Sequence, residues 1–120
     1  MVVGLGCDVL EVKRIERSIQ KESFLRHVYT AKEQQMSGGK ASFYAGNFAV
    51  KEAVSKCFGT GFRGMELTDI EVLRDIYGKP YVNLYGGAKD LANKLNIKNI
   101  LVTISNTKSI VMACAVAETQ

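Results

Sequence analysis

Apolar residues change their spacing along the chain, and the change separates extended segments from helical ones. Val2 to Val9 is a run of β-branched and other apolar residues, which is typical of a buried strand. From Leu10 to Gln20 the spacing becomes helical, because Leu10, Ile15 and Ile19 can share one apolar stripe. The chain is therefore expected to begin with a strand that leads directly into an amphipathic helix.

Capping residues and glycines mark two further helices. Thr30-Ala31-Lys32-Glu33 has the spacing of a capping box and predicts the start of a short helix. Ser37-Gly38-Gly39-Lys40 ends that helix, and Ser42 is placed to cap a long helix over Phe43 to Phe58. Gly59-Thr60-Gly61 should stop the long helix, because glycine tolerates positive φ.

After Thr68 the apolar spacing is that of strands. Tyr77-Gly78-Lys79-Pro80 predicts a hairpin turn, and the second strand of the hairpin is Tyr81 to Tyr85. The remaining predicted elements are a helix from Gly86 to Leu95 and two strands, Ile100 to Ser105 and Ile110 to Ala117. This order predicts an α+β fold, with a long central helix packed on an antiparallel sheet.

Composition limits the organisation and the location of the protein. A chain of 120 residues, 47% of them hydrophobic, suits one domain over residues 1–120. No apolar run approaches the roughly 20 residues that cross a bilayer, and Met1 to Gly6 lacks the features of a secretory signal. A cytoplasmic protein is expected. Cys7, Cys57 and Cys114 then read as reduced small hydrophobes, since their number is odd and their spacing wide.

The basic residues are concentrated near the N-terminus. The formal net charge of +4 favours an anionic partner without choosing its class. The side chains of this N-terminal basic segment are Lys13, Arg14, Arg17, Lys21, Arg26 and His27. A solvated basic face needs no partner, however, and His27 is expected to be a capping or half-buried histidine because no acid or nucleophile stands beside it in the sequence.

Several motifs follow one another in an order that is specific to one family. They are Gly4-Leu5-Gly6-Cys7-Asp8-Val9, the Glu11 to Glu16 stretch, Phe48 to Lys56, Gly59-Thr60-Gly61 and Gly78-Lys79-Pro80. Over essentially the whole chain they resemble the holo-acyl-carrier-protein synthases, the small type of 4′-phosphopantetheinyl transferase. The resemblance implies transfer of 4′-phosphopantetheine from coenzyme A to a serine of apo acyl carrier protein, with release of 3′,5′-ADP, for fatty acid biosynthesis. It also implies a homotrimer with active sites between subunits.

The resemblance assigns the chemistry to Asp8, Glu52 and Lys56. Charge on a pyrophosphate can be neutralised by Mg²⁺ held by one or two carboxylates and substrate phosphate, and Asp8 and Glu52 fit that role. Taken alone, each would be read as a solvated carboxylate. Lys56 shares the helix face of Glu52 and is expected at the phosphate oxygens. Lys51 flanks the same ligand and is a second, less favoured candidate for that contact, with an ordinary solvated lysine as the alternative for both. Glu52 and a metal-bound water both remain open as the proton acceptor.

The resemblance also implies two binding surfaces. The residues expected to contact coenzyme A are Lys56, Gly59, Thr60, Gly61, Lys79, Pro80, Ser105, Asn106 and Thr107. Taken alone, the Gly59 segment reads as a helix stop and the Lys79 segment as a turn. The residues expected to contact an acidic helix of the carrier protein are Arg14, Arg17, Lys21 and Arg26.

Two positions depart from the family pattern and leave alternatives open. Ser105-Asn106-Thr107 stands where Ser-His-Thr is common, and Asn47 stands where arginine is frequent. Neither change removes the carboxylates, so we expect activity with an altered affinity for coenzyme A. One alternative is a degenerate transferase that binds coenzyme A without turnover. Another is a noncatalytic module whose basic helix docks an acidic protein or RNA, although the aromatic pattern of common RNA modules is missing, so no nucleic acid is expected.

Overall fold

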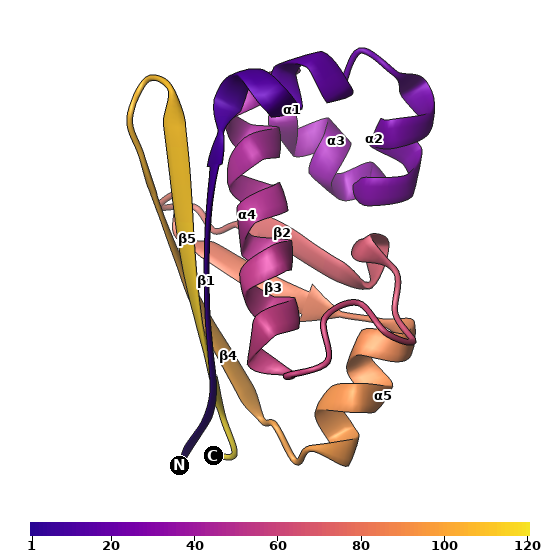
Figure 1. The fold of residues 1–120 in the computed structure, drawn as a ribbon, viewed down its shortest axis with the longest axis vertical. Coiled ribbons are helices and arrows are strands. Elements are labelled where there is room, and N and C mark those ends of the chain that lie inside the picture. The colour runs from indigo at the N-terminus through magenta and orange to yellow at the C-terminus, as the bar shows by residue number, and fades with distance from the viewer.

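The longest helix, α4 (Ala41–Cys57), packs along a three-stranded sheet in the computed structural model, which describes residues 1–120 (Figure 1). The central strand is β5 (Ile110–Glu118), which pairs with β1 (Val2–Glu11) on one side and β4 (Asn99–Asn106) on the other. Both pairings are antiparallel. The prediction of an α+β fold with a long central helix on an antiparallel sheet is confirmed.

A second sheet consists of one hairpin, β2 (Ile70–Arg74) and β3 (Pro80–Leu84), as predicted. It follows the short 3-10 helix η1 (Leu67–Asp69), and α5 (Gly86–Lys94) connects it to β4. The hairpin contacts α4 through β2 and contacts β4 through β3. In Figure 1 it crosses behind α4, whereas β1 runs alongside α4, on the side of the three-stranded sheet. Helix α4 therefore separates β1 from the hairpin.

Three short helices cover one end of α4 (Figure 1). They are α1 (Val12–Ser18), α2 (Glu22–Val28) and α3 (Ala31–Ser37). The predicted capping box of α3 is present, since Thr30 N donates to Glu33 Oε1 at 3.0 Å and Glu33 N donates to Thr30 Oγ1 at 3.3 Å. The sequence did not predict α2, because this helix of seven residues has no side-chain cap and depends on packing against the core.

Helix α4 starts earlier than predicted. Its N-cap is Lys40, and no side chain caps it, so the prediction that Ser42 is the cap was wrong. The reason lies in the preceding turn: Gly38 and Gly39 have φ of +59° and +74°, and they redirect the chain so that the helix begins at Ala41. The Ser42 side chain is exposed as a result.

Strand β1 lies directly on the backbone of α4. A Cβ atom at Gly6 would overlap the carbonyl oxygen of Ala53, and one at Gly4 would overlap that of Cys57. Only glycine permits this approach. The two glycines therefore bring the neighbouring residue Asp8 close to the side of α4.

The two faces of β1 differ. Leu10 is buried on the side of α4, whereas Leu5, Cys7 and Val9 are exposed on the opposite face. Cys7 lies opposite Cys114 of β5, with 3.4 Å between their Sγ atoms and no disulfide. The expectation of buried cysteines thus holds for Cys57 and is wrong for Cys7, because Cys7 alternates onto the outer face of the sheet.

Small residues allow α4 to approach the sheet. Ala45, Ala49 and Ala53 of α4 and Ala113 and Ala115 of β5 are fully buried members of one cluster of 22 core residues. Side chains of this size bring helix and strand axes close together. No helix in the chain combines the length and apolarity needed to cross a membrane.

Candidate functional site

Asp8, Glu52 and Lys56 come together where β1 crosses α4. Lys56 Nζ lies 3.5 Å from Asp8 Oδ1 and donates a hydrogen bond of 2.7 Å to the carbonyl oxygen of Cys7. The Asp8 side chain is 20% exposed and the Lys56 side chain 51% exposed. The ammonium group is thus held at the strand while remaining accessible to a ligand.

The charge of Asp8 acts on Glu52. Burial raises the pKa of Glu52, the charge of Asp8 raises it further, and Lys56 and Arg14 oppose the change. Two carboxylates that repel each other in a partly buried place favour a bound cation.

Lys51 does not belong to this cluster, and the hypothesis that it meets phosphate oxygens was wrong. Its side chain is fully buried and forms an ion pair of 2.8 Å with Glu33. Lys51 Nζ also donates to the carbonyl oxygens of Leu67 and Ile70. Burial lowers the pKa of Lys51, and Glu33 opposes that change. Lys51 and Lys56 are five positions apart, so their side chains point about 140° apart around the helix.

Asn47 belongs to the same buried network. Its Nδ2 donates to Glu33 Oε2 at 2.8 Å and to the carbonyl oxygen of Val72 at 2.9 Å. The residue is fully buried, so it joins α3, α4 and β2 and does not reach a ligand. Asn47 is therefore a structural amide.

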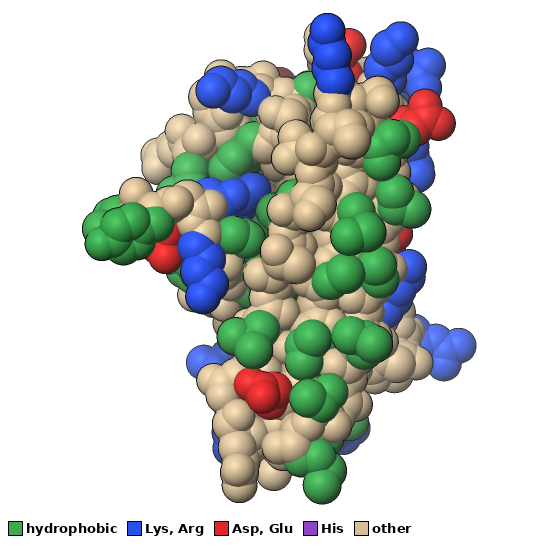
Figure 2. All heavy atoms as spheres, turned by 90° about the vertical axis from the view of Figure 1, so that its left-hand side faces the viewer, with side chains coloured by type: hydrophobic (Ala, Val, Ile, Leu, Met, Phe, Trp, Pro, Cys, Tyr) green, Lys and Arg blue, Asp and Glu red, His purple; other side chains and the backbone are tan.

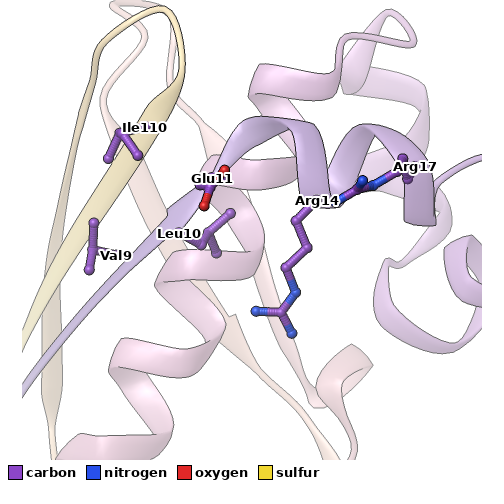
Figure 3. Close-up of a pocket in the computed structure, with 6 residues that line it drawn as sticks. All are labelled: Val9, Leu10, Glu11, Arg14, Arg17 and Ile110. Carbon is purple, nitrogen blue, oxygen red and sulfur yellow. The ribbon is translucent and has the colours of Figure 1, made fainter.

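Arg14 and Arg17 of α1 line an open cavity of about 430 Å³. Figure 3 shows its lining, with Arg14 extending from α1 and Leu10 and Glu11 at the end of β1. Arg14 also opposes the rise in the pKa of Glu52, so its charge acts on that carboxylate.

The other basic candidates lie further along the surface. Lys21 is exposed, and Arg26 is exposed in α2 at 4.0 Å from Glu22. His27 is exposed rather than half-buried, and its Nδ1 donates to the carbonyl oxygen of Ser23 at 2.7 Å. No catalytic partner lies beside it.

The candidate contacts for coenzyme A fall into separate places. Gly59, Thr60 and Gly61 are exposed directly after α4, and the two glycines have φ of +76° and +64°, as the helix stop predicted. Lys79 is exposed in the β2–β3 turn. Ser105, Asn106 and Thr107 line a hollow of about 200 Å³ at the β4–β5 hairpin.

A further cavity of about 340 Å³ joins two of the predicted segments. Its lining residues are Lys40, Ser42, Phe43, Gly46, Arg74, Gly78, Pro80, Ile104 and Asn106. The structure thus brings the Gly78 turn beside Asn106, but on the β4 side of α4, whereas Asp8 and Glu52 lie on the β1 side. The sequence did not predict that Lys40 and Arg74 line a cavity. The only signal was their position, because Lys40 shortly precedes the predicted long helix and Arg74 shortly precedes the predicted hairpin turn.

Comparisons with known proteins identify the family of the chain. A family model described as "ACPS: 4'-phosphopantetheinyl transferase superfamily" matches residues 4–115. The holo-[acyl-carrier-protein] synthase of Lachnoclostridium phytofermentans is 48% identical over 118 residues, which cover 98% of this chain and 97% of the relative.

Solved structures share the fold. The holo-[acyl-carrier-protein] synthase of Neisseria meningitidis superposes with a TM-score of 0.90 at 30% identity, covering 98% of this chain and 99% of that one. The synthase of Bacillus anthracis, in complex with CoA (3′,5′-ADP), gives a TM-score of 0.83 at 32% identity, with coverage of 100% and 99%. The family match, the sequence identity over nearly the whole chain and the shared fold show that the chain belongs to the 4′-phosphopantetheinyl transferase superfamily, among the holo-[acyl-carrier-protein] synthases.

Proposed function

We propose that this protein transfers the 4′-phosphopantetheine arm of coenzyme A to a serine of an apo acyl carrier protein for fatty acid biosynthesis. The observation that carries the proposal is the pair of repelling carboxylates, Asp8 and Glu52, beside the accessible ammonium of Lys56. Coenzyme A as the substrate is supported by the solved structure of the Bacillus anthracis synthase, which is in complex with CoA (3′,5′-ADP). An acyl carrier protein as the acceptor is supported by the name of the curated relatives, holo-[acyl-carrier-protein] synthase.

Asp8 and Glu52 are the residues that would hold Mg²⁺. No cluster of three or more His, Cys, Asp and Glu side chains lies in the chain, so phosphate and water oxygens would complete the coordination of the ion. A bound Mg²⁺ supplies charge neutralisation on the pyrophosphate.

The transfer itself is a displacement at phosphorus. The serine oxygen bonds to the β-phosphorus, the bridging P–O bond breaks, and 3′,5′-ADP leaves. Lys56 donates to phosphate oxygens from its position beside Asp8, where its ammonium is held by Cys7 O. Glu52 is the carboxylate of this chain that is a candidate to accept the serine proton.

The carrier protein docks on the basic surface in this proposal. Arg14 and Arg17 line the cavity where β1 meets α1, and the exposed Lys21 and Arg26 follow along the chain. An acidic helix placed there would bring its neighbouring serine to the reacting phosphate. Arg14 connects the two surfaces, since it lies close enough to Glu52 to affect its charge.

A homotrimer would cover the outer face of the sheet. That face exposes apolar side chains on all three strands, including Leu5, Val9 and Leu101 at 70%, 63% and 53% exposure. Figure 2 shows hydrophobic side chains running along it. Exposed apolar surface of this extent is typical of interfaces. A cyclic trimer would also bring the β4 side of one copy, with the Gly78 and Asn106 cavity, to the β1 side of the next.

The decisive experiment incubates apo acyl carrier protein, coenzyme A and Mg²⁺ with the protein and measures the mass of the carrier. A phosphopantetheine adduct is expected. If the protein binds coenzyme A but no adduct forms, it is a degenerate transferase. If it binds the carrier protein but neither binds coenzyme A nor forms an adduct, it is a docking module. The cytoplasmic location stays a prediction.

A further inference from the structure

Two cysteines face each other on the outer face of the three-stranded sheet. Cys7 of β1 is the direct partner of Cys114 of β5, and 3.4 Å separates their Sγ atoms. Both are free thiols, and Cys7 is exposed whereas Cys114 is half-buried. The proposed transfer uses neither sulfur atom, so the chemistry of this pair is separate from that of the carboxylates.

The backbone around the pair brings the two side chains as close as an antiparallel sheet allows. Val12 N donates to the carbonyl oxygen of Ser109 at 2.9 Å, and this bond continues the β1–β5 register. Hydrogen-bonded and non-hydrogen-bonded pairs alternate along such a ladder, so Cys7, five positions before Val12, falls in a non-hydrogen-bonded pair. The carbonyl oxygen of Cys7 agrees, since it accepts from Lys56 Nζ and β1 is an edge strand. In pairs of this kind the Cα atoms are about 4.5 Å apart, which is within the range that a disulfide spans.

The third cysteine lies on the other side of the sheet. Cys57 of α4 is buried, and its Sγ donates to the carbonyl oxygen of Ala115 at 3.4 Å. Burial raises the pKa of this thiol to about 11, which keeps it in the less reactive protonated form at neutral pH. Within the folded chain, Cys7 and Cys114 therefore have only each other as disulfide partners.

The surroundings of the pair favour a disulfide over a zinc ion. The adjacent outer-face residues of β1 are the exposed Leu5 and Val9, which cannot ligate a metal. No group of three or more His, Cys, Asp and Glu side chains that could hold a metal ion is present in the chain. Two thiolates would fill half of the tetrahedral coordination that zinc takes in structural sites.

We propose that Cys7 and Cys114 are a modification site, at which a peroxide forms a reversible disulfide within one chain. In the first step hydrogen peroxide oxidises the exposed Cys7 thiol to a sulfenic acid, and one molecule of water leaves. The Cys114 sulfur then attacks the sulfenic sulfur, the S–S bond forms, and a second molecule of water leaves. The two thiols together lose two electrons and two protons, and the peroxide is reduced to water. A thiol reductant reverses the change.

The bond would join the first strand of the fold to the last. Cys7 and Cys114 are 107 positions apart, and cross-links that close long loops restrict the unfolded chain most. The edge strand β1, which also carries Asp8, would then be tied covalently to the central strand of its sheet. The oxidised protein should therefore resist unfolding better than the reduced protein.

The test treats the folded protein with hydrogen peroxide and then counts the remaining thiols. The wild type should lose two of its three free thiols and two hydrogen atoms in mass, and peptide mapping should identify the link between Cys7 and Cys114. Dithiothreitol should restore all three thiols. Cys57→Ser is the matched control and should form the same link, whereas Cys7→Ser and Cys114→Ser should form none. Thermal unfolding should shift to higher temperature on oxidation of the wild type and not of Cys7→Ser.

Several results would overturn the inference. They are oxygen atoms added to Cys7 without a link, a link that contains Cys57, a link between two chains on a non-reducing gel, and an oxidised protein that is no more stable than the reduced one. Leu101→Glu is oxidised in parallel, because copies that assemble on the outer face would shield the pair. A link in either protein supports the inference, and its absence from both overturns it.

Discussion

Lys56 Nζ lies 3.5 Å from Asp8 Oδ1 and at the same time donates to the backbone of the preceding residue, Cys7, at 2.7 Å. One side chain of α4 is thus bound to two neighbouring residues of β1. This double contact sets where the ammonium stands relative to the carboxylates, and it follows from the close approach of the strand to the helix.

Asp8→Ala and Glu52→Ala should each reduce turnover by more than the 10–100-fold that is typical of residues one contact removed from a metal. Stability should not fall, because the two carboxylates repel each other and the partly exposed Lys56 pair contributes little. Carrier modification and thermal unfolding measure the two effects, with Asp90→Ala on the exposed face of α5 as the control. Wild-type turnover of either variant at saturating Mg²⁺ would remove that residue from the site.

Arg17→Glu should raise the Michaelis constant for the carrier protein and leave that for coenzyme A unchanged, since it places a negative charge against an acidic helix. The effect should shrink as salt increases. Arg14→Glu should do the same and also lower kcat, because Arg14 lies close to Glu52. Equal losses for both substrates in Arg17→Glu, independent of salt, would contradict the docking surface.

Lys51 and Lys56 offer a matched pair on one helix. Lys51→Met should destabilise the fold by about 3–5 kcal/mol, because it leaves the buried carboxylate of Glu33 without its cation. Lys56→Met should leave stability nearly unchanged and lower turnover. Chemical denaturation and carrier modification separate these outcomes. The double variant Glu33→Gln with Lys51→Met should recover part of the lost stability, and failure to do so would mean that the pair is not the cause.

Leu101→Glu should disrupt assembly, because it places a charge on the exposed apolar face of the sheet. Sedimentation should show a trimer for the wild type and smaller species for the variant, with loss of activity. Leu95→Glu, at an exposed leucine that follows α5, is the control. A fully active wild-type monomer at assay concentration would exclude active sites shared between copies.

Asn106→His should lower the Michaelis constant for coenzyme A and barely change that for dephospho-coenzyme A. An imidazolium has a pKa of about 6.5 in isolation, and Arg74 and Lys40 in the same cavity would lower it, so the gain should be clearest in mildly acidic buffer. Steady-state kinetics over pH 5 to 8 measures it. Equal changes for the two substrates would place Asn106 away from the 3′-phosphate.

Local patterns predicted most of the elements, because their causes are local. The Thr30 and Glu33 capping box and the positive φ of Gly59 depend on residues a few positions apart. The roles of Lys51 and Arg74 depend on partners from other elements, so spacing alone did not reveal them. Asn47 looked like a lost ligand contact in the sequence, although its donors point to Glu33 and to a backbone carbonyl of β2.

The carboxylates Asp8 and Glu52 sit on a strand and a helix that are separated by little more than backbone. Because Gly6 has no side chain, the carbonyl oxygen of Ala53 occupies the space that a Cβ would need. The separation of the two carboxylates therefore depends on how closely these two main chains approach each other. A single methyl group at Gly6 would push the strand away from the helix and so move Asp8 relative to Glu52, although both acids would still be present.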